Sequence, residues 1–294
     1  MSRHDAPAIR FHEDARLFRE AVSFTAAQTG FAARLVEKDY FCTLLLAHLA
    51  PAMGTQVVFK GGTCLAKVHV DFYRLSEDLD FAIPLPVDAS RARRSRCAEA
   101  IKGAIGAVAD SQPAFRLLQP LRGASNCTQY IGTVGYDSPT TAQAETIKVE
   151  VSLREPLLTP VLSGSARTVL LDPITGTAMV PEVALPCISM MEALAEKFRA
   201  ALTRREAAIR DFYDIDHTVR QLSIDVRAGR FVGLVRRKLL VPGNATVVLG
   251  ANRLAELGRQ MPGRLKPVLR QQDFDAFDLD RAFGMVTAVG ELVA

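Results

Sequence analysis

Two neighbouring stretches decide the fold of this chain: VVFKGGT at residues 57–63 and SEDLDF at residues 76–81. The apolar start of the first predicts a strand over residues 57–59, which ends at a glycine pair and is followed by a short helix over residues 63–70. In the second, acidic and apolar residues alternate as in a half-buried strand, which is expected over residues 78–83. The two stretches therefore predict a strand, a glycine turn, a helix and a second strand.

Helical and extended segments alternate around these stretches up to about residue 187. Apolar residues recur at helical spacing in several segments, and IKVEVSL at residues 147–153 alternates cleanly between apolar and polar positions. The other elements expected here are helices over residues 14–27, 31–52 and 90–109 and strands over residues 115–118, 128–134 and 146–153.

From Ser189 onward the sequence is helical in character. Ser189 and Glu192 form a capping-box pattern at the start of an apolar helix. Further helices are expected over residues 207–220, 226–240, 251–260 and 274–288. The predicted fold class is therefore α+β, with a mixed-sheet lobe and N-terminal helices in residues 1–187 and an all-helical lobe in residues 188–294.

Composition limits the class of protein. The 294 residues are 49% hydrophobic and 23% charged, as in a globular protein. No apolar run reaches the roughly 20 residues of a membrane span, and no secretory signal opens the chain, so we expect a cytoplasmic protein without membrane contact. The cysteines lack the spacing of a zinc knuckle or redox motif, and most of them are expected to be buried apolar residues. They are Cys42, Cys64, Cys97, Cys127 and Cys187.

Positive charge is concentrated in the C-terminal part of the chain. Residues 197–270 contain 16 Lys and Arg against 6 Asp and Glu, an excess of +10 within a total net charge of only +4. Such a segment favours a polyanionic partner such as RNA, although a set of solvated helix faces explains the same excess equally well. Arg236, Arg237 and Lys238 are expected on this RNA-binding surface.

Asp78 and Asp80 are candidate metal ligands. They stand two residues apart in a predicted strand, so both carboxylates project from one face. Carboxylates that close repel one another unless a cation lies between them, and Mg²⁺, or Mn²⁺ as the alternative, is a suitable ion. Glu150 shares the polar face of its own strand and is the candidate third ligand, because three carboxylates can hold two ions for an in-line displacement. An isolated Asp-x-Asp pair is more often a set of strand-edge charges.

The glycine pair Gly61-Gly62 is a candidate phosphate-binding turn. Glycines between a strand and a helix let backbone N–H groups approach phosphate oxygens, and the helix N-terminus favours an anion. The spacing is neither that of a P-loop nor that of a dinucleotide fingerprint. A tight turn without a ligand is the alternative explanation.

Taken together, these motifs resemble the AbiEii/MenT-type toxin nucleotidyltransferases, a branch of the DNA polymerase β-like superfamily. Matching segments extend from about residue 37 to 215, and their combination is specific although each one alone is not. The segments are EKDY at residues 37–40, GGT at 61–63, RLSEDLDF at 74–81, Glu196-Lys197 and RDFYD at 210–214.

The resemblance implies a bilobed polymerase β-like fold and transfer of a nucleoside monophosphate from an NTP, with pyrophosphate as the leaving group. It also implies a toxin that adds a nucleotide, a pyrimidine in mycobacterial relatives, to the 3′ end of tRNA and so blocks translation, and that a cognate antitoxin restrains. Carried over residue by residue, the metal ligands fall on Asp78 and Asp80, the phosphate-binding glycines on Gly61 and Gly62, and the C-terminal catalytic pair on Lys197 and Asp211.

The other site residues are assigned around these positions. The triphosphate is expected to be held by the glycine turn, the hydroxyls of Thr63 and Ser76, and Lys60 or Arg74. Glu150 is the nearest candidate for the proton acceptor. Lys197 is expected to neutralise phosphate charge while Asp211 orients it or the sugar. An interhelix ion pair without a catalytic role is the alternative for these two residues.

Two other functions remain open at this stage. The same carboxylates would serve a transferase that adds a nucleotide to a small molecule or to a protein hydroxyl. A catalytically silent module that binds RNA or an antitoxin is the alternative outside enzymes, and the intact glycine pair, Asp78 and Asp80 argue against it.

Overall fold

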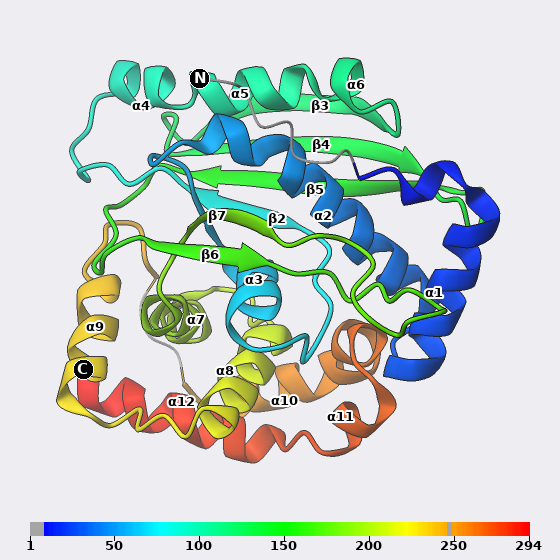
Figure 1. Ribbon diagram of the computed structural model, residues 1–294. Coiled ribbons are helices and arrows are strands. Elements are labelled where there is room, and N and C mark those ends of the chain that lie inside the picture. The colour runs from blue at the N-terminus through cyan, green and yellow to red at the C-terminus, as the bar shows by residue number, and fades with distance from the viewer. Residues whose placement is uncertain (1–8, 246–248) are drawn as a thin grey trace.

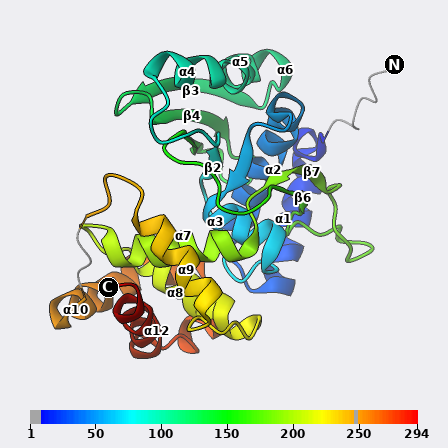
Figure 2. The same ribbon diagram turned by 90° about the vertical axis from the view of Figure 1, so that its left-hand side faces the viewer.

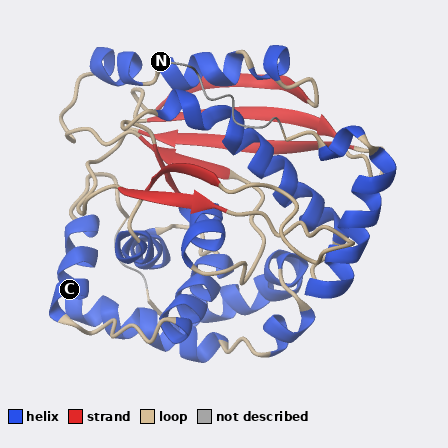
Figure 3. Cartoon of the chain, viewed as in Figure 1, coloured by secondary structure: helices blue, strands red, loops and turns tan. Residues whose placement is uncertain are grey.

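One mixed sheet organises the computed structural model, which describes residues 9–245 and 249–294 (Figure 1). Its strand order is β3-β4-β5-β2-β1-β7-β6, and Figure 3 shows the strands as one continuous layer. The strands are β1 (Val58–Lys60), β2 (Leu79–Ala82), β3 (Phe115–Ala124), β4 (Gln129–Asp137), β5 (Ala144–Ser152), β6 (Leu162–Ala166) and β7 (Val183–Cys187).

The centre of the sheet is formed by the strands that were predicted first. Strand β1 pairs antiparallel with β2 and parallel with β7, and β2 pairs parallel with β5. In register across the three strands, Phe59, Phe81 and Val151 are buried. Because side chains alternate along a strand, the neighbouring register row turns its polar residues to the opposite face.

The N-terminal helices cover the sheet. Helix α2 lies across it, and α5 and α6 pack on β3 at one edge (Figure 1). Phe41 of α2 stacks on Tyr136 of β4 with ring centroids 3.9 Å apart. The helices of this half are η1 (Phe11–Glu13), α1 (Ala15–Thr29), α2 (Ala33–Met53), α3 (Gly61–Cys64), the π-helical η2 (Leu65–His69), α4 (Arg91–Cys97), α5 (Glu99–Gly106) and α6 (Val108–Ser111).

The remaining helices gather beside the β7 and β6 edge of the sheet, as the turned view in Figure 2 shows. Buried apolar side chains of both halves form one continuous cluster, and the division into lobes 1–187 and 188–294 stays a prediction. None of the described helices is long and apolar enough to cross a bilayer. The helices are α7 (Met190–Thr203), α8 (Ile209–Gln221), α9 (Gly229–Leu239), α10 (Ala251–Gln260), η3 (Met261–Leu265), η4 (Lys266–Val268), α11 (Gln271–Asp275) and α12 (Leu279–Val293).

The predicted α+β fold class is confirmed, with three local corrections. The segment 90–109 is three short helices rather than one, and the helix expected from residue 274 begins at Leu279, where the Asp278 side chain accepts a hydrogen bond from the N–H of Arg281. Ser189 caps α7 as predicted, but the Glu192 carboxylate accepts hydrogen bonds from the N–H groups of residues 158 and 159. Strands β6 and β7 were not predicted.

Candidate functional site

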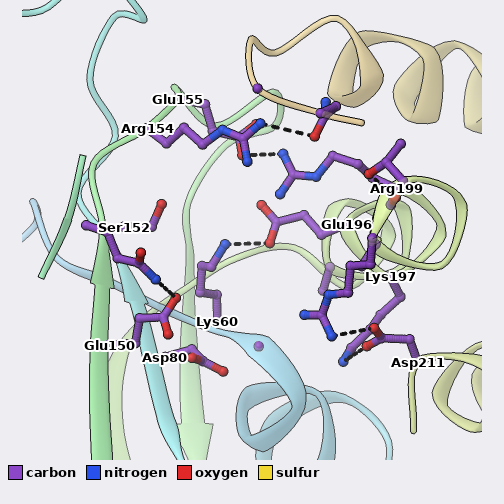
Figure 4. Close-up of a pocket in the computed structure, with 18 of the residues that line it drawn as sticks. Lys60, Asp80, Glu150, Ser152, Arg154, Glu155, Glu196, Lys197, Arg199 and Asp211 are labelled. Atoms are coloured by element: carbon purple, nitrogen blue, oxygen red, sulfur yellow. Dashed lines mark hydrogen bonds and ion pairs between the residues drawn. The ribbon is translucent and has the colours of Figure 1, made fainter. Parts of the chain in front are cut away.

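Three polar side chains form a row across the centre of the sheet. Lys60 of β1 is the register partner of Asp80 in β2, and Asp80 is in turn the partner of Glu150 in β5. Figure 4 shows Asp80 and Glu150 on adjacent strands, with Lys60 reaching away from them toward Glu196 of α7. The sheet therefore places Asp80 beside Glu150, as the alternation of both strands predicted, and the register position of Lys60 on its other side was not predicted.

Asp80 lies in an environment that disfavours its charge. Burial, followed by repulsion from Glu150, raises the pKa of Asp80 to about 6. Neither of its oxygens accepts a hydrogen bond from the described part of the chain. Asp78 immediately precedes β2 and is exposed, and partial burial of its carboxyl raises its pKa as well. A cation beside Asp80 would balance the carboxylate charge and contact the oxygens to which no described residue donates a hydrogen bond.

Glu150 already has partners for both oxygens. Gln129 donates to Oε1 at 2.6 Å, and the Lys148 ammonium donates to Oε2 at 2.8 Å. Within residues 9–245 and 249–294, Asp78, Asp80 and Glu150 do not form a group whose ligand oxygens all lie within 4.8 Å of one another. The predicted role of Glu150 as a third ligand therefore requires its carboxylate to turn away from Lys148 and Gln129.

The glycine turn is built against Asp80. Gly61 has φ +75°, and a Cβ added there would lie 2.2 Å from Oδ2 of Asp80. A Cβ on Gly62 would lie 2.4 Å from Nη2 of Arg74. Thr63 is buried, and its hydroxyl donates to the backbone carbonyl of Asp78. The hydroxyl predicted to bind phosphate thus holds in place the segment that carries the predicted metal ligands.

Gly61→Ala is expected to abolish nucleotide transfer, because the new methyl group must displace the Asp80 carboxylate. The matched control is Gly176→Ala, where φ is +69° and an added Cβ meets no atom within 4 Å. Both variants should lose about 1–2 kcal/mol of unfolding free energy from the left-handed backbone. Turnover and thermal midpoints would separate the two effects, and equal turnover of the two variants would contradict the role given to Gly61.

Lys197 and Asp211 meet as predicted, but within a larger cluster. The Lys197 ammonium lies 2.9 Å from Asp211 and 2.8 Å from Asp214, and Arg204 lies 2.9 Å from the other oxygen of Asp211. Arg74 donates from Nε and Nη2 to the two oxygens of Asp214. Burial alone would raise the pKa of Asp214, yet Arg74 and Lys197 hold it well below its usual range.

Among the residues predicted to bind phosphate, Arg74 has the most tightly held side chain. Its side chain is only 3% exposed and is bound in place by Asp214. One guanidinium nitrogen, Nη1, is buried without a hydrogen-bond partner in the described ranges. Ser76 lies close to the same glycine turn, with Oγ 3.5 Å from the Cβ position of Gly62. Nη1 is inaccessible in this conformation, so a direct contact of Arg74 with a triphosphate would require the side chain to move.

A cavity of about 570 Å³ lies between the polar row of the sheet and helix α7. Figure 4 shows Asp80 and Glu150 on its strand side and Glu196, Lys197 and Asp211 on its helix side. Asp78, Thr63, Arg74 and Ser76 do not line it. The lining polar residues that sequence reasoning missed are Ser125, Thr128, Gln129, Ser152, Arg154, Glu155, Arg199, Thr203 and Asn244.

Part of the cavity wall comes from beyond residue 220, where no motif was recognised. The Arg154 guanidinium donates to the carbonyl of Pro242 at 2.6 Å and to the side chain of Asn244 at 3.1 Å. These bonds join the segment after β5 to the segment after α9. The chain carries no local signal for this contact, since the partners stand 88 and 90 positions apart.

The prediction that Lys238 lies on an RNA-binding surface is wrong. Its side chain is fully buried, and its ammonium lies 2.7 Å from Glu192, 3.0 Å from Glu196 and 3.4 Å from Glu155. Arg236 and Arg237 are exposed on the same helix. Lys238 falls on the buried face of α9 with Phe231 and Val235, and this helical spacing was visible in the sequence.

Comparison with known proteins agrees with this geometry. MenT4, a nucleotidyltransferase toxin from Mycobacterium tuberculosis H37Rv, has a similar structure, with a TM-score of 0.54 at 19% identity over 94% of this chain and 98% of that chain. JHP933 from Helicobacter pylori has a TM-score of 0.50 at 14% identity over 90% and 93%. These likenesses show the shared fold.

A search of curated proteins found no match to this sequence. Residues 44–284 match the family described as nucleotidyl transferase AbiEii toxin, type IV TA system. This match covers most of the chain. It includes the polar row of Lys60, Asp80 and Glu150, the Gly61-Gly62 turn, and Lys197 with its partners Asp211 and Asp214. The chain therefore belongs to the AbiEii nucleotidyltransferase toxin family.

Proposed function

We propose that this protein is the toxin of a toxin–antitoxin pair and transfers a nucleoside monophosphate from an NTP to the 3′ end of RNA, tRNA above all, thereby blocking translation. The observation that carries the proposal is Asp80, an unpartnered carboxylate beside Glu150 at a cavity whose other wall holds Lys197. This arrangement suits an anionic substrate that arrives with a cation. Family membership supports the transferase chemistry.

Asp78 and Asp80 are the residues proposed to hold Mg²⁺, or Mn²⁺ as the alternative, with Glu150 as the third ligand. The fit rests on the raised pKa of Asp80 and on the absence of any hydrogen bond to its oxygens from the described residues. A bound divalent ion would stabilise negative charge that develops on the transferred phosphate.

The chain's own residues supply binding, positioning and proton transfer. The Gly61-Gly62 turn and Lys60 bind the triphosphate, with Arg74 supporting the turn behind Gly62, and Lys197, paired with Asp211, neutralises the triphosphate charge. The RNA 3′-oxygen bonds to the α-phosphorus, the bond from that phosphorus to the oxygen bridging the β-phosphate breaks, and pyrophosphate leaves. Glu150 is proposed to accept the hydroxyl proton.

The proposed setting follows from the substrates and the family. The nucleotide is proposed to be a pyrimidine and the regulatory partner a cognate antitoxin, as the resemblance implies. The site of action is proposed to be the cytoplasm, where NTPs and tRNA are found. The family description, a toxin of a type IV system, supports the antitoxin part of this proposal.

The RNA surface is proposed to lie on the exposed arginines of the C-terminal half. Arg205, in the turn after α7, and Arg237 on α9 are exposed. Replacing both with Glu should weaken RNA binding and flatten the slope of log affinity against log salt by about 1.4, since each single-strand phosphate contact contributes about 0.7. Affinity for free NTP should stay near that of the wild type, because the triphosphate is bound at the sheet.

The matched control reverses Arg93 and Arg96, two exposed arginines of α4, which lies at the far end of the sheet from α9 (Figures 1 and 2). This variant has the same net charge as the first one. Equal RNA affinity of the two variants, or binding that salt does not weaken, would contradict the surface and favour a small-molecule or protein substrate.

A further inference from the structure

A group of soft metal-ligating side chains lies behind the glycine turn. Cys64 ends α3, His69 ends η2 and Cys187 ends β7. One ligand atom from each lies within 4.8 Å of the other two, and no other trio of His, Cys, Asp and Glu in residues 9–245 and 249–294 meets this distance. Both cysteines are buried, and His69 is partly exposed.

The ring of His69 is held by a backbone carbonyl. Its Nε2 lies 2.9 Å from the carbonyl oxygen of Ile188, which can only accept a hydrogen bond, so Nε2 carries the proton. In the neutral ring, Nδ1 then has the free electron pair. A metal-bound histidine commonly donates its second N–H to a carbonyl in this way.

The two sulfurs face each other. The Cys64 and Cys187 side chains lie within hydrogen-bond distance of one another, and Cys187 is also within hydrogen-bond distance of His69. A bound cation would deprotonate both thiols, since coordination favours the thiolate strongly.

We propose that Cys64, His69 and Cys187 form a binding site for one Zn²⁺ ion, separate from the carboxylates that serve Mg²⁺. Two thiolates, a neutral imidazole and Zn²⁺ carry no net charge, which limits the cost of burial. Sulfur and nitrogen ligands select Zn²⁺ over Mg²⁺. Three protein ligands leave the fourth tetrahedral position of the ion to a water molecule.

The position of the site gives the ion a structural role. Cys64 directly follows the turn and helix start at residues 61–63, and Cys187 stands two residues before the cap of α7. The ion would therefore tie the phosphate-binding turn to the start of the helix that carries Lys197. Zn²⁺ should raise the thermal midpoint of the full chain, independently of any transfer activity.

The test is a titration of the metal-free, reduced full chain with Co²⁺ as a spectroscopic substitute for Zn²⁺. The wild type should develop a thiolate-to-cobalt charge-transfer band that saturates at one equivalent and disappears when Zn²⁺ is added. His69→Ala, Cys64→Ser and Cys187→Ser should each weaken Zn²⁺ binding by at least about 100-fold. Because His69 is partly exposed, its variant should fold even if a cysteine variant does not.

Cys42→Ser is the matched control, because Cys42 is equally buried but lies outside the group. It should retain the cobalt band, the stoichiometry and the rise in thermal midpoint. A wild type without a thiolate band would overturn the proposal. So would a band that persists in His69→Ala and Cys187→Ser, or a Cys64–Cys187 disulfide that forms in air in a chain that binds no zinc when reduced.

Discussion

Asp80→Asn should lose at least about 10³-fold in nucleotide transfer and yet be more stable than the wild type in metal-free buffer at pH 7.5. The loss follows because the variant lacks the buried carboxylate proposed to hold the metal, and a catalytic metal contributes several kcal/mol to transition-state stabilisation. The gain follows because the folded protein has to keep the Asp80 charge in a site that disfavours it.

The pH dependence of the stability gain follows from the pKa of Asp80. Burial raises it from 3.8 to about 6. Below about pH 3 the carboxyl is protonated in both states, so wild type and Asp80→Asn should be equally stable. Between pH 4 and 6 the Asp80 carboxyl is ionised in the unfolded wild type but still largely protonated in the folded wild type. The stability of the wild type therefore falls relative to that of Asp80→Asn. Above pH 6 the difference should level off at up to about 3 kcal/mol, or roughly 5 °C in thermal midpoint.

Asp78→Asn is the matched control for this result. Asp78 is exposed, so its replacement should reduce transfer similarly while changing the thermal midpoint little. Turnover with added Mg²⁺ and melting curves with a chelator would measure both effects. Transfer by Asp80→Asn within tenfold of the wild type would rule out the metal assignment.

Lys238→Met should cost about 3–5 kcal/mol of unfolding free energy, because it removes the cation that lies among three buried carboxylates. For a chain of this length the thermal midpoint should fall by roughly 5–8 °C. The pKa of Glu196 is held well below its usual range, against the effect of burial, by Lys60 and Lys238. Acid therefore weakens the stabilisation that ionised Glu196 gives the wild type. The difference in unfolding free energy between the wild type and Lys238→Met should narrow below about pH 5.

Arg237→Met is the control for Lys238→Met, since Arg237 is the exposed neighbour on the same helix. Its thermal midpoint should stay within about 1 °C of the wild type, as expected for an ordinary surface substitution. A Lys238→Met variant that melts together with the control would show that the carboxylates do not depend on this ammonium.

The polar face that carries Asp80 and Glu150 could be predicted, because the alternation of side chains along a strand is a local property of the sequence. Period-2 alternation places Asp78 with Asp80, and Lys148 with Glu150, on one face whatever the neighbouring strands do. The glycine pair was recognisable because only a residue without a Cβ tolerates the backbone at Gly61 and its approach to Asp80. Hydrophobic periodicity likewise located most of the helices.

The elements that were missed depend on distant partners. Strand β6, with the sequence LSGSA, has almost no apolar pattern, and β7 contains a proline, so pairing with β1 and not local preference makes this edge of the sheet. The cysteine and histidine ligands of the proposed zinc site likewise come together only through the pairing of β7 with β1. Lys238 differs from these elements, since its helical spacing from Phe231 and Val235 already indicated the buried face of α9.

The central claim is that the cavity beside Asp80 transfers a nucleoside monophosphate to RNA. The most direct measurement incubates the protein with Mg²⁺, total RNA and each NTP labelled at the α-phosphate, and identifies the labelled molecule. We predict label at the 3′ end of tRNA from a pyrimidine nucleotide, release of pyrophosphate, and no label with Asp80→Asn. Label in the protein or in a small molecule, or no transfer from any NTP, would contradict the account.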